Sequence, residues 1–332
     1  MTLGLVDVIL FGLLVMVITA LLAPVEAFAA WAGWGEIADI PSDAHLPVTP
    51  NEHDAERFIV FLDGISKGTR HDVARVSDFL AALENALPES RLITDVLPYS
   101  VFNLALTDPS YPLSGFWQRV EARKLAGNPV GFLINIRNSL QVLVSADWRY
   151  GLVYNLGMAK LILRALVRRG YRPGSHVPVA LIGYSGGGQV AAGTASLIGG
   201  ALGIDVTVIS VAGVVSGSGD FSRVRKWYQI VSDRDPVERL GVLAFPMRWR
   251  LMWFSRWHRA RREGRLELKR LDGAAHTGNG SYMDAQAPAA GGGSQLERTL
   301  RLVQNCLAVP ETNASPKNDR EALGKPLKTR RP

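Results

Sequence analysis

The sequence of 332 residues is poor in cysteine, lacks internal repeats and has no lysine or arginine before Arg57. Its single cysteine, Cys306, excludes an internal disulfide framework and a cysteine-rich zinc site. What remains is a chain with 47% apolar residues, long enough to bury a full core in one domain with extensions. The formal net charge of +7 suits nucleic acid or an anionic membrane surface, and composition alone does not choose between them.

The N-terminus carries a long hydrophobic run. Residues 3–23 are almost wholly apolar, about the length of a helix that crosses a bilayer, and Pro24 ends the run. We therefore predict a transmembrane anchor over residues 1–24. A cleaved signal peptide is the alternative, because AFA at 27–29 resembles a cleavage site, although the basic n-region is missing. The lack of basic residues near the run leaves its orientation in the membrane open.

Three further segments follow the anchor. Residues 25–56 contain three prolines and scattered acids, which is typical of a juxtamembrane linker. Residues 309–332 are polar and basic, which indicates a disordered tail. Between them, residues 57–308 alternate short apolar runs with amphipathic stretches, the pattern of βα units around a buried parallel sheet. Residues 99–147 exceed an ordinary connection and predict a helical cap over the sheet.

The predicted fold class is α/β. We expect a mostly parallel sheet of about six strands, with helices on both faces, a helical cap insertion and the N-terminal transmembrane helix. Strands are expected at 58–62, 92–97, 178–183, 206–211, 227–232 and 266–271, and helices over 73–87, 148–169 and 295–307.

A glycine-rich turn carries the strongest motif. GYSGG at 183–187 matches GxSxG directly after a predicted buried strand and before a helix of small residues. Glycines are needed there because a Cβ would collide with neighbouring backbone, and the helix N-terminus favours developing negative charge. An incidental serine in a glycine-rich turn is the alternative. Strand, turn and helix together favour Ser185 as a nucleophile.

An acid and a histidine follow in the order that such a nucleophile requires. Asp235 lies on the turn after the strand WYQIVS, and His276 lies in a glycine-rich loop after the strand LELKRL. Asp233 competes for the role of the acid, and an ordinary loop histidine is the alternative for His276. We predict Ser185, Asp235 and His276 as the catalytic residues.

GYSGG, the DRDPV turn and the GAAH loop, in that order, resemble the α/β-hydrolase family over about residues 57–308. No subfamily is identified. The resemblance implies a lipase- or esterase-like serine hydrolase that forms an acyl-enzyme and needs neither a metal nor an organic cofactor. In the family, a turn after an early strand supplies an oxyanion donor, often from an HG pair; here the turn reads FLDGISKGT. The resemblance therefore implies Ile65 and Gly186 as the backbone donors, and a reduced sheet.

The segment 245–262 indicates the kind of substrate, because it contains six arginines, three tryptophans and no carboxylate. This composition suits the headgroup region of anionic lipid. On a helix, four aromatic residues of the segment would share one face: Phe245, Trp249, Trp253 and Trp257. With the anchor, this favours an anionic membrane as partner and a lipid or long-chain acyl ester as substrate. The alternative is a helix that packs on the sheet and exposes a solvated basic face.

Three other residues are candidate substrate contacts. Tyr184 adjoins the nucleophile, and Lys67 and Arg70 follow the oxyanion turn, where they would meet a phosphate headgroup or simply solvent. Fold and triad do not set the acyl acceptor, so a thioesterase, peptidase or acyltransferase remains an alternative, as does a catalytically silent membrane scaffold. We expect no nucleic-acid partner, because no known nucleic-acid motif is present.

Overall fold

The computed structural model describes residues 55–65, 70–100, 103, 105–109, 114–126, 128 and 131–308, together with Leu14, Ile18 and Val25, which are helical. The predicted anchor, linker and tail lie almost wholly outside the described residues, and they stay predictions. Lys67 also lies outside them.

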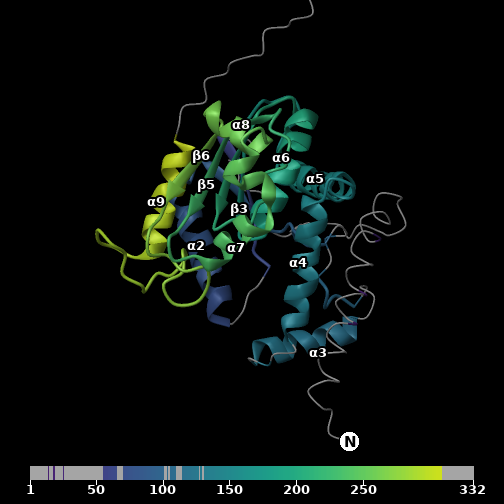
Figure 1. Cartoon of the computed structure of the whole chain (residues 1–332), viewed down its shortest axis with the longest axis vertical. Helices are drawn as coiled ribbons and strands as arrows, with labels where there is room; N and C mark the ends of the chain where they lie inside the picture. The colour runs from purple at the N-terminus through teal and green to yellow at the C-terminus, as the bar shows by residue number, and fades with distance from the viewer. Residues whose placement is uncertain are drawn as a thin grey trace, which may run out of the picture.

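Six strands form one parallel sheet in the order β2-β1-β3-β4-β5-β6 (Figure 1). The strands are β1 (Arg57–Leu62), β2 (Ser90–Ile93), β3 (Val179–Tyr184), β4 (Val206–Val211), β5 (Val224–Val231) and β6 (Leu266–Arg270). Every residue of β3 is buried, as expected for a central strand covered on both faces. The prediction of a mostly parallel sheet of about six strands is confirmed.

The second strand differs from its prediction, because it ends at Ile93 rather than at 97. It is an edge strand that pairs only with β1, and Val60 opposite Ile93 is the last pair of its ladder. Beyond it, the backbone N–H of Leu97 donates to the side chain of Asn103 at 2.8 Å. The apolar run therefore continues into a turn, where a side chain satisfies the backbone in place of a neighbouring strand.

Helices cover both faces of the sheet. They are α2 (Arg70–Ala86), α3 (Ser114–Leu125), α4 (Phe132–Ala146), α5 (Gly151–Arg168), α6 (Gly187–Leu202), α7 (Pro236–Ala244), α8 (Arg256–Arg262) and α9 (Gln295–Leu307), with short 3-10 turns η2 (Pro246–Arg248) and η3 (Arg250–Met252). Side chains of α2 and α9, such as Phe79 and Val303, join one core cluster. Side chains of α5, α6 and α8, such as Tyr154, Val190 and Trp257, join the other.

The predicted cap region contains α3 and α4. A small separate cluster of Trp117, Val120 and Leu133 joins these two helices, and Figure 1 shows α3 lying at the end of α4 farther from the sheet. In the part of the chain that the structure describes, no single helix has both the length and the apolar composition of a membrane span. The helical stretches 133–146 and 151–168 meet that measure only as a pair, and they are bent by 105°.

The segment 245–257 is not one helix, so the shared helical face that we predicted for its aromatic residues is wrong. Helix α7 ends at Ala244, two 3-10 turns follow, and α8 begins at Arg256. Pro246 explains the break, because it has no N–H to donate and disfavours helical backbone at Phe245, which is extended with φ −114° and ψ 95°. Ser255 then starts α8 as its N-cap, by accepting from the N–H of His258.

Candidate active site

A sharp turn between β3 and α6 carries Ser185. Its φ of 51° lies in the left-handed region, which is strained for a residue with a side chain. The flanking glycines make the turn possible: a Cβ at Gly183 would lie 2.5 Å from the carbonyl oxygen of Gly187, and one at Gly187 would lie 2.1 Å from that of Leu62. The turn is held by Ser185 N–H donating to the carbonyl of Val211 at 3.0 Å.

Three side chains from separate strand ends meet at this turn. The Oγ of Ser185 lies 2.8 Å from Nε2 of His276. The Nδ1 of His276 lies 3.0 and 2.9 Å from the two carboxylate oxygens of Asp235. Asp235 is completely buried, while Ser185 and His276 keep 7% and 8% of their surface exposed. A chain of hydrogen bonds thus runs from a buried carboxylate to a hydroxyl at the surface of the site.

The two aspartates of the turn after β5 have different partners. Asp235 is the N-cap of α7, where Oδ1 accepts from the N–H groups of Val237 and Glu238 at 2.9 and 3.0 Å. Asp233 instead accepts from the N–H of Gly273 at 2.7 Å, and that hydrogen bond lowers the pKa of its carboxyl. Asp235 therefore faces the imidazole, and Asp233 holds the loop that leads to it.

Tyr184 contacts the loop that carries His276. Its hydroxyl donates to the carbonyl of His276, and the two rings stack with centroids 5.9 Å apart. Only 6% of Tyr184 is exposed, and burial raises the pKa of its phenol. The hydroxyl of Tyr184 is thus bound within the protein, and its role as a substrate contact stays a prediction.

The predicted oxyanion residues lie together. A Cβ at Gly186 would lie 2.8 Å from Cγ1 of Ile65 and 2.8 Å from Cγ2 of Val142, so the turn after β1 and helix α4 both contact the start of α6. Gly64 is equally close to the elbow, since its Cβ would lie 3.2 Å from that of Ser185. Arg70 is the first residue of α2, and its side chain lies outside the described part of the chain.

The four aromatic residues predicted to face lipid have separate environments. Trp249 and Trp253 are 42% and 66% exposed, and Phe245 is half-buried. Trp257 is only 2% exposed, packs edge-on against Trp227 and lies under the guanidinium of Arg248 at 4.6 Å. The prediction of Trp257 as an interface residue is wrong, because the break in the helix turns it into the core.

Residues of the cap that sequence reasoning missed also reach the site. The hydroxyl of Tyr99 donates to the carbonyl of Asp63, and Asn138 Nδ2 donates to that of Ile65. These pairs are 36 and 73 residues apart in the sequence, and neither Tyr99 nor Asn138 belongs to a motif. No sequence signal identifies such contacts, since the path of the segment 99–147 is set by tertiary packing.

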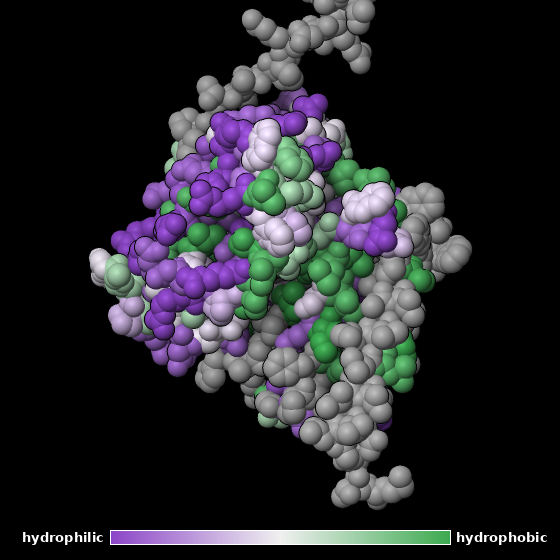
Figure 2. Space-filling model, viewed as in Figure 1, coloured by the Kyte–Doolittle hydropathy of each residue, from purple (hydrophilic) through white to green (hydrophobic). Residues whose placement is uncertain are grey.

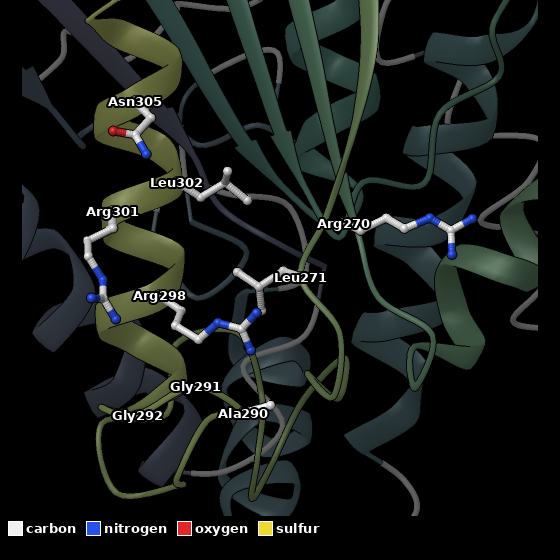
Figure 3. Close-up of a pocket in the computed structure, with 9 residues that line it drawn as sticks. All are labelled: Arg270, Leu271, Ala290, Gly291, Gly292, Arg298, Arg301, Leu302 and Asn305. Carbon is white, nitrogen blue, oxygen red and sulfur yellow. The ribbon is translucent and has the colours of Figure 1, made fainter.

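A pocket of about 290 Å³ lies elsewhere, between α9 and the chain that leaves β6 (Figure 3). It is lined by Arg270, Leu271, Ala290, Gly291, Gly292, Arg298, Arg301, Leu302 and Asn305. None of the predicted site residues lines it. In Figure 3 the side chain of Arg270 points away from the arginines of α9, so the three guanidinium groups do not converge.

The strand order and the three strand-end residues define an α/β-hydrolase fold: a nucleophile elbow follows β3, an aspartate follows β5 and a histidine follows β6. The expected resemblance is thus confirmed in the fold. No protein-family model matches the chain, and neither does any curated protein.

Solved structures that match include the following three. A predicted CIB-like hydrolase from Thermoplasma acidophilum is 13% identical, with a TM-score of 0.40 over 78% of this chain and 88% of that one. XC6422 from Xanthomonas campestris, described as an α/β serine hydrolase without a lid, is 14% identical, with a TM-score of 0.35 over 78% and 82%. Arabidopsis thaliana SOBER1 is 13% identical, with a TM-score of 0.37 over 76% and 99%. At such identities the likeness concerns the fold alone.

Proposed function

We propose that the chain is a serine hydrolase that cleaves carboxylic esters. The observation that carries this proposal is the chain of hydrogen bonds from Asp235 through His276 to Ser185, with heavy-atom distances of 2.9 and 2.8 Å. Both are hydrogen-bond distances, and that between Ser185 and His276 lies within the reach that proton transfer requires. The strained, glycine-flanked turn presents the hydroxyl at the end of the sheet, which is the position of an activated nucleophile.

The reaction follows from this arrangement. The Oγ of Ser185 attacks the ester carbonyl while His276 Nε2 takes its proton, and the backbone N–H groups of Ile65 and Gly186 stabilise the oxyanion. The imidazolium then gives the proton to the departing alcohol, which leaves an acyl-enzyme. Water, deprotonated by His276, releases the acid and restores the hydroxyl. Asp235 holds the imidazole in one tautomer and stabilises its positive charge.

The same chemistry acts on thioesters and amides, and it passes the acyl group to acceptors other than water, so thioesterase, peptidase and acyltransferase activity are the alternatives.

A fluorophosphonate probe tests the attack by serine, which all these reactions share. We expect it to label the wild-type protein and not Ser185→Ala, because only an activated serine reacts. Labelling that persists in Ser185→Ala overturns the assignment. An unlabelled wild-type protein would favour a silent scaffold.

The proposed substrate is a lipid or another long-chain acyl ester, because exposed apolar side chains lie next to the site. We call the exposed apolar residues that run from α7 to the start of α8 the rim: Val237, Leu240, Leu243, Met247, Trp249, Leu251, Trp253 and Phe254, each at least 36% exposed. On the face shown in Figure 2, hydrophobic surface borders a hollow between α7 and α4. Apolar surface that gathers on one segment is typical of an interaction site.

The proposed partner is an anionic membrane. Arg239, Arg250, Arg256, Arg259, Arg261 and Arg262 accompany the rim and are exposed, and no carboxylate occurs between Arg239 and Arg262. Each basic side chain near an anionic bilayer contributes about 1 kcal/mol of attraction. The proposed N-terminal anchor, residues 1–24, would keep the enzyme at this surface. Retention in the membrane through alkaline carbonate washing tests the anchor, and a mature N-terminus near Ala30 would contradict it.

A further inference from the structure

Two hydrogen bonds hold the oxyanion turn from outside, and the mechanism above does not use them. The hydroxyl of Tyr99 donates to the carbonyl of Asp63 at 2.8 Å. Asn138, on α4, donates through Nδ2 to the carbonyl of Ile65 at 3.3 Å. The two bound carbonyls flank the peptide between Gly64 and Ile65, whose N–H is the proposed oxyanion donor.

The orientation of the peptide between Gly64 and Ile65 depends on contacts from outside the turn. A Cβ at Gly64 would be tightly packed, at 3.0 Å from the ring of Tyr184 and 3.2 Å from Cβ of Ser185. A residue without a Cβ restricts its own dihedral angles least, so the peptide that follows it is poorly fixed by local geometry. Hydrogen bonds to the carbonyls on both sides restrict the rotation that Gly64 leaves open.

The two donors are themselves fixed by a buried arginine. Arg137 is 4% exposed, donates to the carbonyl of Tyr99 and lies 3.3 Å from Oδ1 of Asn138. Burial, together with the nearby carboxylate of Asp63, holds the pKa of Tyr99 well above its ordinary value. The phenol therefore stays protonated and remains a donor throughout the physiological range.

We propose that Tyr99 and Asn138 are positioning residues, which aim the N–H of Ile65 at the oxyanion that forms during ester cleavage. The inference rests on the proposed function. It also gives the cap a second role: α4 carries both Asn138 and Val142, and Val142 contacts Gly186, the other proposed donor. Helix α4 thus contacts the residues of both proposed oxyanion donors, so a shift of α4 alters the stabilisation of the transition state.

Tyr99→Phe and Asn138→Ala test this role. Loss of an oxyanion donor costs about 10²–10³ in kcat, and a donor that is loosened rather than removed is expected to cost about tenfold. We expect each variant to lower kcat on a short soluble ester by that factor while KM changes less than about twofold, because the ground state does not use the donor fully. The Ki of a trifluoromethyl ketone, which forms a tetrahedral adduct with serine, should rise in parallel.

Tyr154→Phe is the matched control. Its hydroxyl also donates to a backbone carbonyl, that of Pro98 at 2.7 Å rather than one in the oxyanion turn, and its ring is completely buried. It should lower the melting temperature as Tyr99→Phe does and leave kcat and the inhibitor's Ki unchanged. If Tyr99→Phe does not fold, the half-buried Asn138 supplies the same comparison. An active wild-type enzyme whose kcat and Ki are insensitive to these changes overturns the inference alone. A wild-type protein that is neither active nor labelled by fluorophosphonate overturns the proposed function instead.

Discussion

The candidate site and the first residues of the rim lie at opposite ends of the short helix α7, and the two ends differ in their exposure to water. Asp235, the N-cap of α7, is completely buried and gives its carboxylate to two backbone N–H groups and an imidazole. Eight residues later, Leu243 is 68% exposed and does not belong to the hydrophobic core. At the N-terminal end of α7, the carboxylate is removed from solvent and fully hydrogen-bonded, and hydrogen bonds are electrostatically stronger away from water. At the other end apolar surface stays in water, which is unfavourable until something covers it.

The largest expected effect comes from removing the charge at the buried end. Asp235→Asn should lower kcat on a short soluble ester by about 10⁴-fold, because the amide no longer stabilises the imidazolium or its tautomer. Asparagine is also a good N-cap, so α7 should remain folded and its circular dichroism unchanged. Asp233→Asn is the matched control two residues away, and we expect a loss below about tenfold, since its amide oxygen still accepts from Gly273. Equal losses in both variants would mean that Asp235 does not act alone.

The next effect concerns the buried ion pair that links α7 to the 3-10 turn η2. Arg248 and Glu238 form a buried ion pair, with the guanidinium over Trp257. Arg248→Met leaves Glu238 buried without its partner and should lower the free energy of unfolding by about 3–5 kcal/mol, measured by urea denaturation. Arg250→Met is the control, because Arg250 is exposed and its loss should change stability by less than about 0.5 kcal/mol. Similar stabilities of these two variants would refute a structural role for the pair.

The smallest effect on ester hydrolysis is expected from changes in the rim, which should weaken membrane binding alone. In a chain that begins at residue 25, Leu240→Ser with Trp253→Ala should weaken binding to anionic vesicles by tenfold or more, because burial of each side chain contributes about 1.5–3 kcal/mol. Hydrolysis of a short soluble ester should stay within about twofold of the wild-type rate. Cosedimentation and a spectrophotometric ester assay measure the two quantities.

Leu268→Ser is the control for this comparison, since Leu268 is 38% exposed on the edge strand β6 and lies outside the rim. Raising the salt concentration should weaken the wild type's binding to anionic vesicles, because the arginine contribution is screened. Binding that the double change leaves intact would show that another surface meets the membrane. Loss of ester hydrolysis in step with vesicle binding would show that the rim belongs to the core.

The elbow and the order of the triad residues were predictable because each is tied to a strand end. A buried strand is recognisable as an apolar run, and the carboxyl ends of parallel strands share one edge of the sheet. Ser185, Asp235 and His276 had therefore to gather at that edge if the strands were read correctly. The choice between Asp235 and Asp233 was harder, because both follow the same strand and only backbone geometry decides which carboxylate turns inward.

The rest depended on contacts that local sequence does not encode. Periodicity placed Trp257 with the other aromatics, and one proline broke that periodicity, so the ring turned toward Trp227 instead. Tyr184 adjoins the nucleophile in the sequence, but only the tertiary structure shows that its hydroxyl donates to the carbonyl of His276. Tyr99 and Asn138 gave no signal, since their partners are distant in the sequence.

The capping role of Asp235 also divides α7 into a constant and a replaceable part. Its first turn is committed, because Val237 and Glu238 supply the N–H groups that orient the carboxylate. Beyond that turn, Arg239, Leu240 and Leu243 are exposed to solvent and contact none of the three candidate catalytic residues through a hydrogen bond described above. The exposed side chains of Arg239, Leu240 and Leu243 can therefore be exchanged without disturbing the carboxylate, whereas Gly241 and Arg248 are buried and have to stay. Grafting acidic, basic or neutral outer faces onto one unaltered active site would retarget the enzyme to different surfaces while its intrinsic chemistry is inherited unchanged.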